Sequence, residues 1–217
     1  MQHHISCLFM RGGTSHGPFF NAADLPADLA ARGRVLLNVT GSPDRRQIDG
    51  LGGAHPLTSK VGIVSRSSRS GIDPEFPFAQ LQPDGDTVDT TPNCGNMLAA
   101  VVPFALETGL ATPQGDVTTL RVLTRNTDMA RDISVQTPRE RLRYDGDARI
   151  DGVASVPPGA IKRISVEHPS GEFSVELETD PANPQTVRST ALLRTARLIM
   201  RGEVMESESA FIGGDAT

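Results

Sequence analysis

Residues 90–109 read TTPNCGNMLAAVVPFALETG and place a cysteine between two asparagines and a glycine, directly ahead of an apolar run. The apolar residues between Met97 and Leu106 cover every side of a helical wheel, which is typical of a helix buried on all sides. Asn93 is a favourable N-cap residue, and Pro103 predicts a kink. Because most of the remaining chain has strand patterns, we expect an α+β fold in which strands wrap around this helix.

The chain outside this helix has mostly the composition of strands separated by turns. One further helix is indicated over residues 24–39, which read DLPADLAARGRVLLNV. Strands are predicted where β-branched residues are frequent or where apolar and polar residues alternate. These segments are residues 5–10, 61–65, 76–82, 119–125, 132–137 and 141–146.

A β-hairpin is predicted over residues 161–178. Ile164 and Val166 alternate with polar residues before the turn sequence HPSG. The alternation resumes after the turn with Phe173 and Val175. Alternation on both sides of a turn sequence is the pattern of two antiparallel strands.

The composition is that of a folded, globular protein. A chain of 217 residues with 37% hydrophobic and 22% charged residues holds one or two domains with a real core. The net charge is −5, there is one Tyr and no Trp, and no Lys/Arg cluster occurs, so we expect no nucleic-acid partner.

The sequence contains neither a membrane signal nor a metal-binding cysteine pattern. No stretch approaches the roughly 18 apolar residues of a membrane span, and the opening MQHHISCLFMRGG lacks the features of a signal peptide. We therefore expect a cytoplasmic protein without a membrane partner. Cys7 and Cys94 do not form a disulfide framework, and nothing nearby completes a zinc site, so we expect no metal.

Cys94 stands at the predicted start of the buried helix. Free N–H groups and the helix dipole at such a position favour a thiolate or the binding of an anion. Gly95 would let a ligand approach the backbone closely, so the N–H groups around Gly95 and Asn96 could hold a carboxylate. The alternative interpretation is that a small residue simply fills space at the start of a helix.

Two further segments have the composition of functional loops. Residues 11–17, RGGTSHG, contain the small and hydroxyl residues of a backbone anion-binding nest, although such a loop is more often only a turn. Residues 41–53 form a loop longer than an ordinary connection. Lys60 lies beside a strand start, where a lysine is usually solvated unless it is buried near the Cys94 helix.

Six long blocks of the sequence follow one another in the order of a known family. They are MRGGTSHGPFF (10–20), GSPDRRQIDGLGGAHPLTSKVGIVS (41–65), NCGNMLAAVVPFALETGL (93–110), YDGDARIDGV (144–153), VEHPSGEFSVEL (166–177) and LLRTARLIMRGEV (192–204). Together they resemble the PrpF-type isomerases, a family that includes 2-methylaconitate isomerase and 4-oxalomesaconate tautomerase. The segments HPSGEF and RTARL are most similar to the oxalomesaconate branch.

The resemblance implies a diaminopimelate epimerase-like fold of two similar domains, each a β-barrel-like wrap around a central helix. It also implies proton transfer on a small unsaturated di- or tricarboxylate without a metal or an organic cofactor. By matching motif, Lys60 is the general base or acid and Cys94 is the second proton carrier or a substrate contact. The carboxylates would be held by Thr14, Ser15, Gly95 and Asn96, with Arg11 or Arg45 supplying positive charge.

Two features depart from the family pattern. His16 stands where relatives usually have a lysine, and an imidazole titrates near neutrality instead of holding a fixed charge. After residue 153 the sequence runs directly into the hairpin, whereas relatives carry most of a second domain there. We therefore predict a first domain at 1–153, a remnant of a second domain (the hairpin at 161–178) and a return strand within 154–206, and a flexible tail at 207–217.

Three functions are consistent with these residues. An isomerase would interconvert unsaturated tricarboxylates through Lys60 and Cys94. A non-catalytic remnant would bind a carboxylate and would cover its exposed apolar face by self-association, for example as a homodimer. A thiol-dependent hydrolase or transferase would need a histidine beside Cys94, for which His55 is the local candidate.

Overall fold

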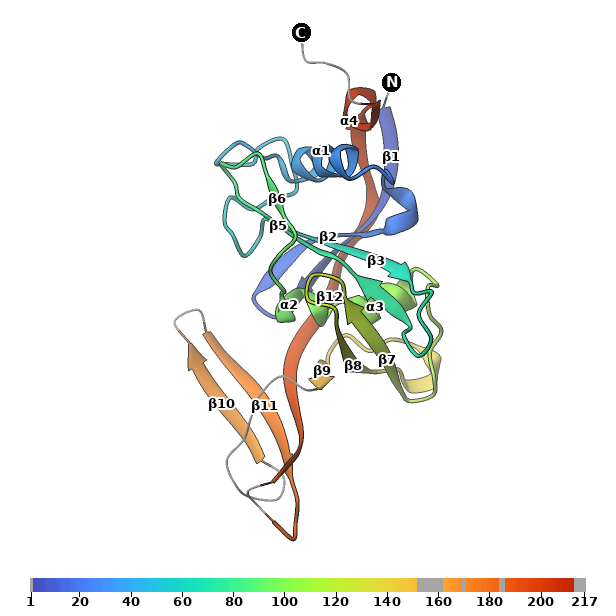
Figure 1. Ribbon diagram of the computed structural model, residues 1–217, viewed down its shortest axis with the longest axis vertical. Helices are drawn as coiled ribbons and strands as arrows, with labels where there is room; N and C mark the ends of the chain where they lie inside the picture. The colour runs from blue at the N-terminus through green and yellow to red at the C-terminus, as the bar shows by residue number, and fades with distance from the viewer. Residues whose placement is uncertain (1, 152–161, 169–170, 184–185, 213–217) are drawn as a thin grey trace.

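The computed structural model describes residues 2–151, 162–168, 171–183 and 186–212 (Figure 1). Within them, eight strands close into a barrel, because the order β1-β2-β3-β4-β7-β8-β9-β12 is completed by pairing of β12 with β1. The pairs β2–β3 and β4–β7 are parallel and the others are antiparallel. These strands are β1 (Gln2–Gly12), β2 (Ser15–Asn21), β3 (Lys60–Arg66), β4 (Pro74–Phe76), β7 (Val117–Thr124), β8 (Met129–Gln136), β9 (Asp147–Asp151) and β12 (Val187–Ser207).

The predicted buried helix occupies the barrel interior as two short helices, α2 (Gly95–Leu98) and α3 (Val101–Glu107). Side chains from Met97 to Ala105 are almost fully buried and form the main core with the strands around them. The expected α+β barrel around a central helix is therefore confirmed. Pro103 has no N–H and its ring crowds the carbonyl four residues earlier, which explains why the helix is interrupted at residues 99–100.

The N-cap prediction for the buried helix was wrong. Cys94 is the N-cap residue of α2, and its side chain makes no capping hydrogen bond. Asn93 instead donates from Nδ2 to the hydroxyl oxygens of Thr124 at 3.3 Å and Thr127 at 2.8 Å. These bonds hold Asn93 against the turn between β7 and β8, one residue before the N-cap position. Because α2 has only four residues, its dipole is weaker than that of the longer helix predicted from the sequence.

A second core lies between one face of the barrel and the helices outside it. Helix α1 (Leu29–Thr40) begins after Asp28, whose carboxylate accepts from the Ala31 N–H at 2.8 Å, so this helix starts later than predicted. Its buried side chains pack with those of β1, β3 and β5. The other elements of this layer are the 3₁₀ turn η1 (Ala22–Asp24), β5 (Phe78–Leu81), β6 (Val88–Asp89) and α4 (Glu208–Ile212).

The sheet continues beyond the barrel as a hairpin. β10 (Lys162–His168) pairs with β11 (Gly171–Thr179), and β11 pairs with the first half of β12. Ile164 opposes Val175, as the alternation predicted, while the turn residues 169–170 lie outside the described residues. Figure 1 shows β12 running from this hairpin along the barrel wall to α4, which lies near the start of β1. Residues 207–212, expected in a tail, form the end of β12 and α4.

The strand predicted at 141–146 was wrong. After β8, Pro138 opens a 3₁₀ turn, η2 (Pro138–Glu140), in which Arg139 has a φ of 55°. The Arg143 guanidinium binds the Asp145 carboxylate two residues later, which holds the chain in a local turn. The next strand, β9, therefore begins only at Asp147.

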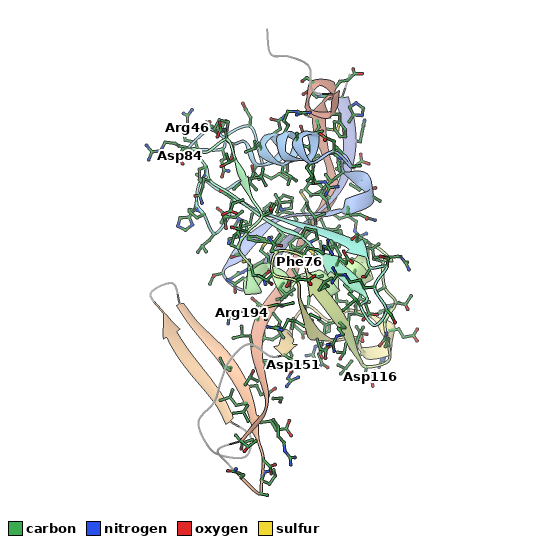
Figure 2. The ribbon with its side chains drawn as sticks, in the orientation of Figure 1. Arg46, Phe76, Asp84, Asp116, Asp151 and Arg194 are labelled. Carbon is green, nitrogen blue, oxygen red and sulfur yellow. The ribbon has the colours of Figure 1, made fainter. Side chains whose placement is uncertain are left out.

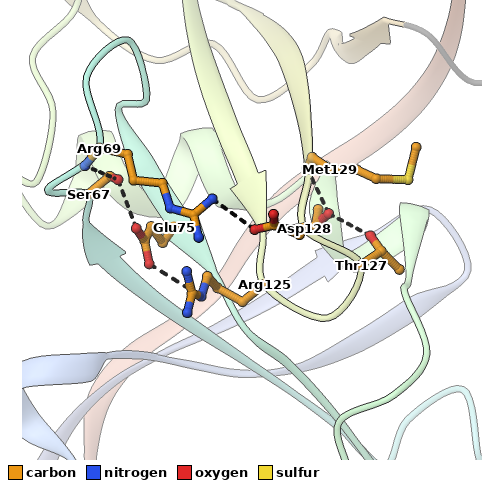
Figure 3. A network of polar contacts seen from close by, with 8 residues as sticks. Ser67, Arg69, Glu75, Arg125, Thr127, Asp128 and Met129 are labelled. Carbon is orange, nitrogen blue, oxygen red and sulfur yellow. Dashed lines mark hydrogen bonds and ion pairs between the residues drawn. The ribbon is translucent and has the colours of Figure 1, made fainter.

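Polar contacts tie the barrel strands together at the turn between β7 and β8 (Figure 3). Arg69 donates to Asp128 at 2.8 Å, and Arg125 lies 3.6 Å from the Glu75 carboxylate. Thr124 donates to the Met129 carbonyl at 2.8 Å. The Arg69–Asp128 pair is exposed on both sides, and such ion pairs contribute little to stability individually.

Glu206 is a buried carboxyl near the end of β12, with only 5% of its surface exposed. Burial raises its pKa from 4.5 to about 7, and a hydrogen bond with Asn38 offsets part of this shift. An acid whose pKa is raised by folding binds more protons in the folded state. Stability therefore falls as the pH rises from about 4.5 to about 7 and stays lower above that range.

We expect Glu206→Gln to stabilise the protein at pH 8 by about 1–3 kcal/mol and to have little effect at pH 5. Glutamine can keep the contact with Asn38 and has no charge to desolvate. Urea unfolding at the two pH values measures the difference. Glu203→Gln is the control, because its exposed carboxylate pairs with His4 at 3.2 Å on the surface. An equal gain for Glu206→Gln at both pH values would contradict the explanation.

Candidate active site

Lys60 and Cys94 meet at one end of the barrel. Lys60 opens β3 and is only 7% exposed, and its Nζ donates to Cys94 Sγ at 3.5 Å. The same Nζ donates to Gln80 Oε1 at 2.8 Å and lies 5.1 Å from the centre of the Phe78 ring. The structure thus brings together the two residues to which the family resemblance assigns proton transfer.

Gln80 holds the Lys60 amine in place and was not identified from the sequence. Its Nε2 donates to the carbonyls of Pro56, Ser59 and Leu81 at 2.9–3.2 Å. Three acceptors around the nitrogen leave the amide oxygen facing Lys60 Nζ, which fixes the orientation of the amide. Gln80 is opposite Lys60 in the β3–β5 pairing, a long-range register that the local sequence does not encode.

The chain leading to Cys94 is anchored by the turn between β7 and β8. Asn93 is held by the hydroxyls of Thr124 and Thr127. Asn126, in the same turn, donates to the carbonyls of Phe78 and Thr90 at 2.7 and 2.6 Å. These contacts tie the Cys94 segment to β5, which also carries Gln80, so thiol and amine are positioned by one shared framework.

Asn96 joins Thr14 and Ser15 beside the thiol, and we call these three side chains the hydroxyl cradle. Asn96 Nδ2 lies 3.0 Å from Thr14 Oγ1 and 3.4 Å from Ser15 Oγ. The two glycines that precede Thr14 allow this approach. A Cβ at Gly12 would lie 1.9 Å from the Asn96 carbonyl oxygen, and Gly13 has a φ of +52°, which favours glycine. The cradle offers both hydrogen-bond donors and acceptors to a carboxylic acid or carboxylate.

Of the two arginines proposed to supply positive charge, Arg11 contacts the backbone just before Thr14 and Arg45 lies on a surface loop. Arg11 donates from Nε to the carbonyl of Gly13, the residue before Thr14, at 2.8 Å. Arg45 is 85% exposed and lies 3.9 Å from Asp84 on a surface loop (Figure 2 labels Asp84). The structure therefore gives Arg45 no contact with Lys60 or Cys94.

The two histidines near the site have local roles. Burial, and then the positive charge of Arg11, lower the pKa of His16, so its imidazole is neutral at physiological pH and supplies no fixed charge. His55 accepts the Leu57 N–H at its Nδ1 at 3.1 Å. The contact made by the Cys94 thiol is with an amine, which does not fit a cysteine–histidine nucleophile.

Gly17 sets the distance between β2 and Lys60, and its replacement tests this packing. A Cβ at Gly17 would lie 1.9 Å from the Lys60 carbonyl oxygen, so Gly17→Ala should force the strands apart and cost about 1–3 kcal/mol. Gly202→Ala is the matched control, because nothing lies within 4 Å of its added Cβ. Urea unfolding should show a control effect within about 0.5 kcal/mol of wild type. Equal stabilities of the two variants would contradict the close approach.

No helix in the described residues combines the length and apolarity needed to cross a bilayer. In the same part of the chain, no three His, Cys, Asp or Glu side chains cluster as a metal site requires.

Comparisons with known proteins agree with this arrangement. The chain is 54% identical over 161 residues to (4E)-oxalomesaconate Delta-isomerase of Novosphingobium sp. (strain KA1), covering 74% of this chain and 44% of that protein. It is 51% identical over 152 residues to 4-oxalomesaconate tautomerase of Pseudomonas putida (strain KT2440), covering 70% and 42%. The matched stretch is thus less than half the length of these curated relatives.

The fold has a match among solved structures. A crystal structure of methylitaconate-delta-isomerase superimposes with a TM-score of 0.84 and 33% sequence identity, covering 97% of this chain and 99% of that chain. The family model described as PrpF protein matches residues 2–161, which include Lys60, Cys94 and the hydroxyl cradle. From its barrel, its site residues and this match, the chain belongs to the PrpF family.

Proposed function

We propose that this chain is a cofactor-independent isomerase, or tautomerase, that moves a proton on a small unsaturated polycarboxylate. The observation that carries the proposal is the 3.5 Å contact between Lys60 Nζ and Cys94 Sγ beside the hydroxyl cradle. An amine and a thiol in contact can each accept or release a proton, which is what the reaction requires. The names of the relatives support a carboxylate substrate.

The proposed reaction removes a proton from a carbon of the conjugated system and returns one to another atom of the same system. Lys60 takes or gives one proton, and Cys94 carries the second or contacts the substrate. The charge that develops is enolate-like and is stabilised by hydrogen-bond donors at Thr14, Ser15 and Asn96. No bond to another reactant forms and no electrons are gained or lost, so the step needs no co-reactant.

The proposed substrate is 4-oxalomesaconate, with 2-methylaconitate as the second candidate. Two relatives named for oxalomesaconate are 54% and 51% identical, whereas 2-methyl-aconitate isomerase of Shewanella oneidensis (strain MR-1) is 38% identical over 178 residues. Proton NMR in deuterated water tests the choice, because each substrate loses a signal where deuterium enters. Exchange with 2-methylaconitate alone would overturn the preference, and exchange with neither would overturn the activity.

A non-catalytic carboxylate-binding domain is the second candidate, favoured by the short match to the curated relatives. We propose that residues 1–153 form the first domain, that 154–206 combine the remnant of a second domain (the hairpin at 161–178) with the strand that returns to the first, and that the protein is cytoplasmic. A full second domain would supply the opposing half of the cleft. Binding of a polycarboxylate without any deuterium exchange would favour this candidate.

Gly95 distinguishes a ligand-binding role from a structural one. No atom lies within 4 Å of a Cβ added at Gly95, so the fold does not require glycine there. We expect Gly95→Ala to keep the stability of wild type within about 0.5 kcal/mol, while weakening polycarboxylate binding about tenfold by blocking close approach to the backbone. Thermal unfolding and a binding titration measure the two effects. Unchanged binding would mean that the ligand does not approach Gly95.

A further inference from the structure

Arg194 occupies one of a row of inward-facing positions on β12, and the proposed reaction assigns it no role. Alternate residues of β12 face the barrel interior, and Leu192 and Ala196 on either side of Arg194 belong to the core. The Arg194 side chain therefore leaves β12 on the inner face of the barrel wall, where aliphatic residues are usual. Figure 2 shows it on β12 near the end of the barrel at which α2 begins.

Gly13 brings this arginine to the hydroxyl cradle. A Cβ at Gly13 would lie 2.5 Å from Asn96 Oδ1 and 3.0 Å from Arg194 Cδ, so both side chains pack against the same backbone point. The Gly13 N–H donates to the Thr195 carbonyl at 2.8 Å, which fixes the β1–β2 turn against this part of β12. The aliphatic part of the Arg194 side chain thus lies near Asn96, and its Nη1 donates to the Leu193 carbonyl at 3.3 Å.

The environment of Arg194 suits it to an anion. Burial lowers the pKa of its guanidinium from the ordinary value, although an arginine remains cationic at neutral pH. A partly desolvated cation is stabilised by a carboxylate, which a guanidinium can bind through two parallel hydrogen bonds. An ammonium lacks that planar geometry.

We propose that Arg194 binds one carboxylate of the substrate and that, with the hydroxyl cradle, it sets the preference for ligands with several carboxylates. This inference rests on the proposed function and adds a specificity-determining residue to it. The return strand β12 would then contribute to the same site as β3 and α2. A ligand with fewer carboxylates would lose the contact with Arg194 and bind more weakly.

The test is protection of Cys94 from alkylation by iodoacetamide, read by mass spectrometry, with tricarballylate as the probe. Tricarballylate is a saturated tricarboxylate that cannot tautomerise, so the measurement does not depend on turnover. The other thiol, Cys7, is buried with a pKa raised to about 12, so it does not compete at neutral pH. Succinate, with two carboxylates, is the matched weaker probe.

In wild type, tricarballylate should protect Cys94 at lower concentration than succinate. Arg194→Gln should raise the tricarballylate concentration for half-protection about tenfold or more, and should bring it closer to the succinate concentration for half-protection. For Arg194→Lys, the tricarballylate concentration should lie between those of wild type and Arg194→Gln. The control is Arg197→Gln on the same strand, since that guanidinium donates to the Gly146 carbonyl at 3.0 Å, and its protection should match wild type.

The outcomes separate this inference from the function on which it rests. Equal protection of wild type and Arg194→Gln would overturn the role of Arg194 and leave the proposed function standing. Absence of protection in wild type would also overturn this inference, whereas the proposed function is decided separately by deuterium exchange into 4-oxalomesaconate. If Arg194→Gln misfolds, Cys94 is alkylated at an altered rate even without ligand, and Arg194→Lys then becomes the test. Protection of Arg194→Lys at the wild-type concentration of tricarballylate would contradict the proposed bidentate contact.

Discussion

Lys60→Ala is expected to reduce deuterium exchange into 4-oxalomesaconate by about 10²–10⁴-fold, whereas Cys94→Ser should only impair it. The amine is the stronger base of the pair, and its buried position against Gln80 and Phe78 aims it at the thiol. A serine hydroxyl at position 94 can keep a substrate contact. Proton NMR in deuterated water, with wild type measured in parallel, gives both rates.

The controls separate lost chemistry from lost packing. Lys60→Met keeps most of the side-chain volume and should be as inactive as Lys60→Ala, since neither variant can carry a proton. Cys7→Ser removes the other thiol, which is 2% exposed and packs in the second core with Val61 and Ile63. It should destabilise the protein without altering the rate of the folded fraction. Near-wild-type rates in both Lys60→Ala and Cys94→Ser would end the assignment of these two residues.

The buried helix could be predicted because the pattern that indicates it lies within one short stretch of sequence. Apolar residues at every helical position leave no face for water, and Val101, Val102 and Ala105 are all 0% exposed. The strand at 141–146 was predicted wrongly because Leu142 and Tyr144 give an alternating pattern. In the structure that pattern is overridden by the proline-led turn before it and by the Arg143–Asp145 contact.

The strand register that closes the barrel could not be predicted from the local sequence. Pairs such as Ile5 with Val204 join strands that are nearly the whole chain apart, and no local pattern encodes such a register. The same limit applies to Gln80 and Arg194, which reach the site only through long-range pairings. Lys60 and Cys94 were found because they lie in motifs that resemble the family, and the structure then placed them in contact.

The 217-residue chain is expected to self-associate. In the described residues, β10 pairs only with β11 and ends the strand order, so one row of its backbone groups is open to another strand. Ile199 and Met200 on β12 are also 55% and 43% exposed. A symmetric dimer could cover such surfaces in both copies at once. Multi-angle light scattering should report a dimer or larger species, and Ser165→Pro in β10 should shift it toward monomer.

Self-association would not restore a complete cleft, and the chain should therefore be a much weaker catalyst than a relative with the full length. A second copy presents Lys60, Cys94 and the hydroxyl cradle again, whereas the proposed second domain would close over the substrate with a different set of groups. A poorly positioned substrate costs up to about 10²-fold in rate, so we expect exchange with 4-oxalomesaconate to be about 100-fold slower than for the Pseudomonas putida tautomerase. Both proteins are assayed at equal site concentration, with light scattering on the same samples. A clean monomer with the turnover of the full-length relative would contradict both parts of this prediction, because the residues of this barrel would then form a sufficient active site alone.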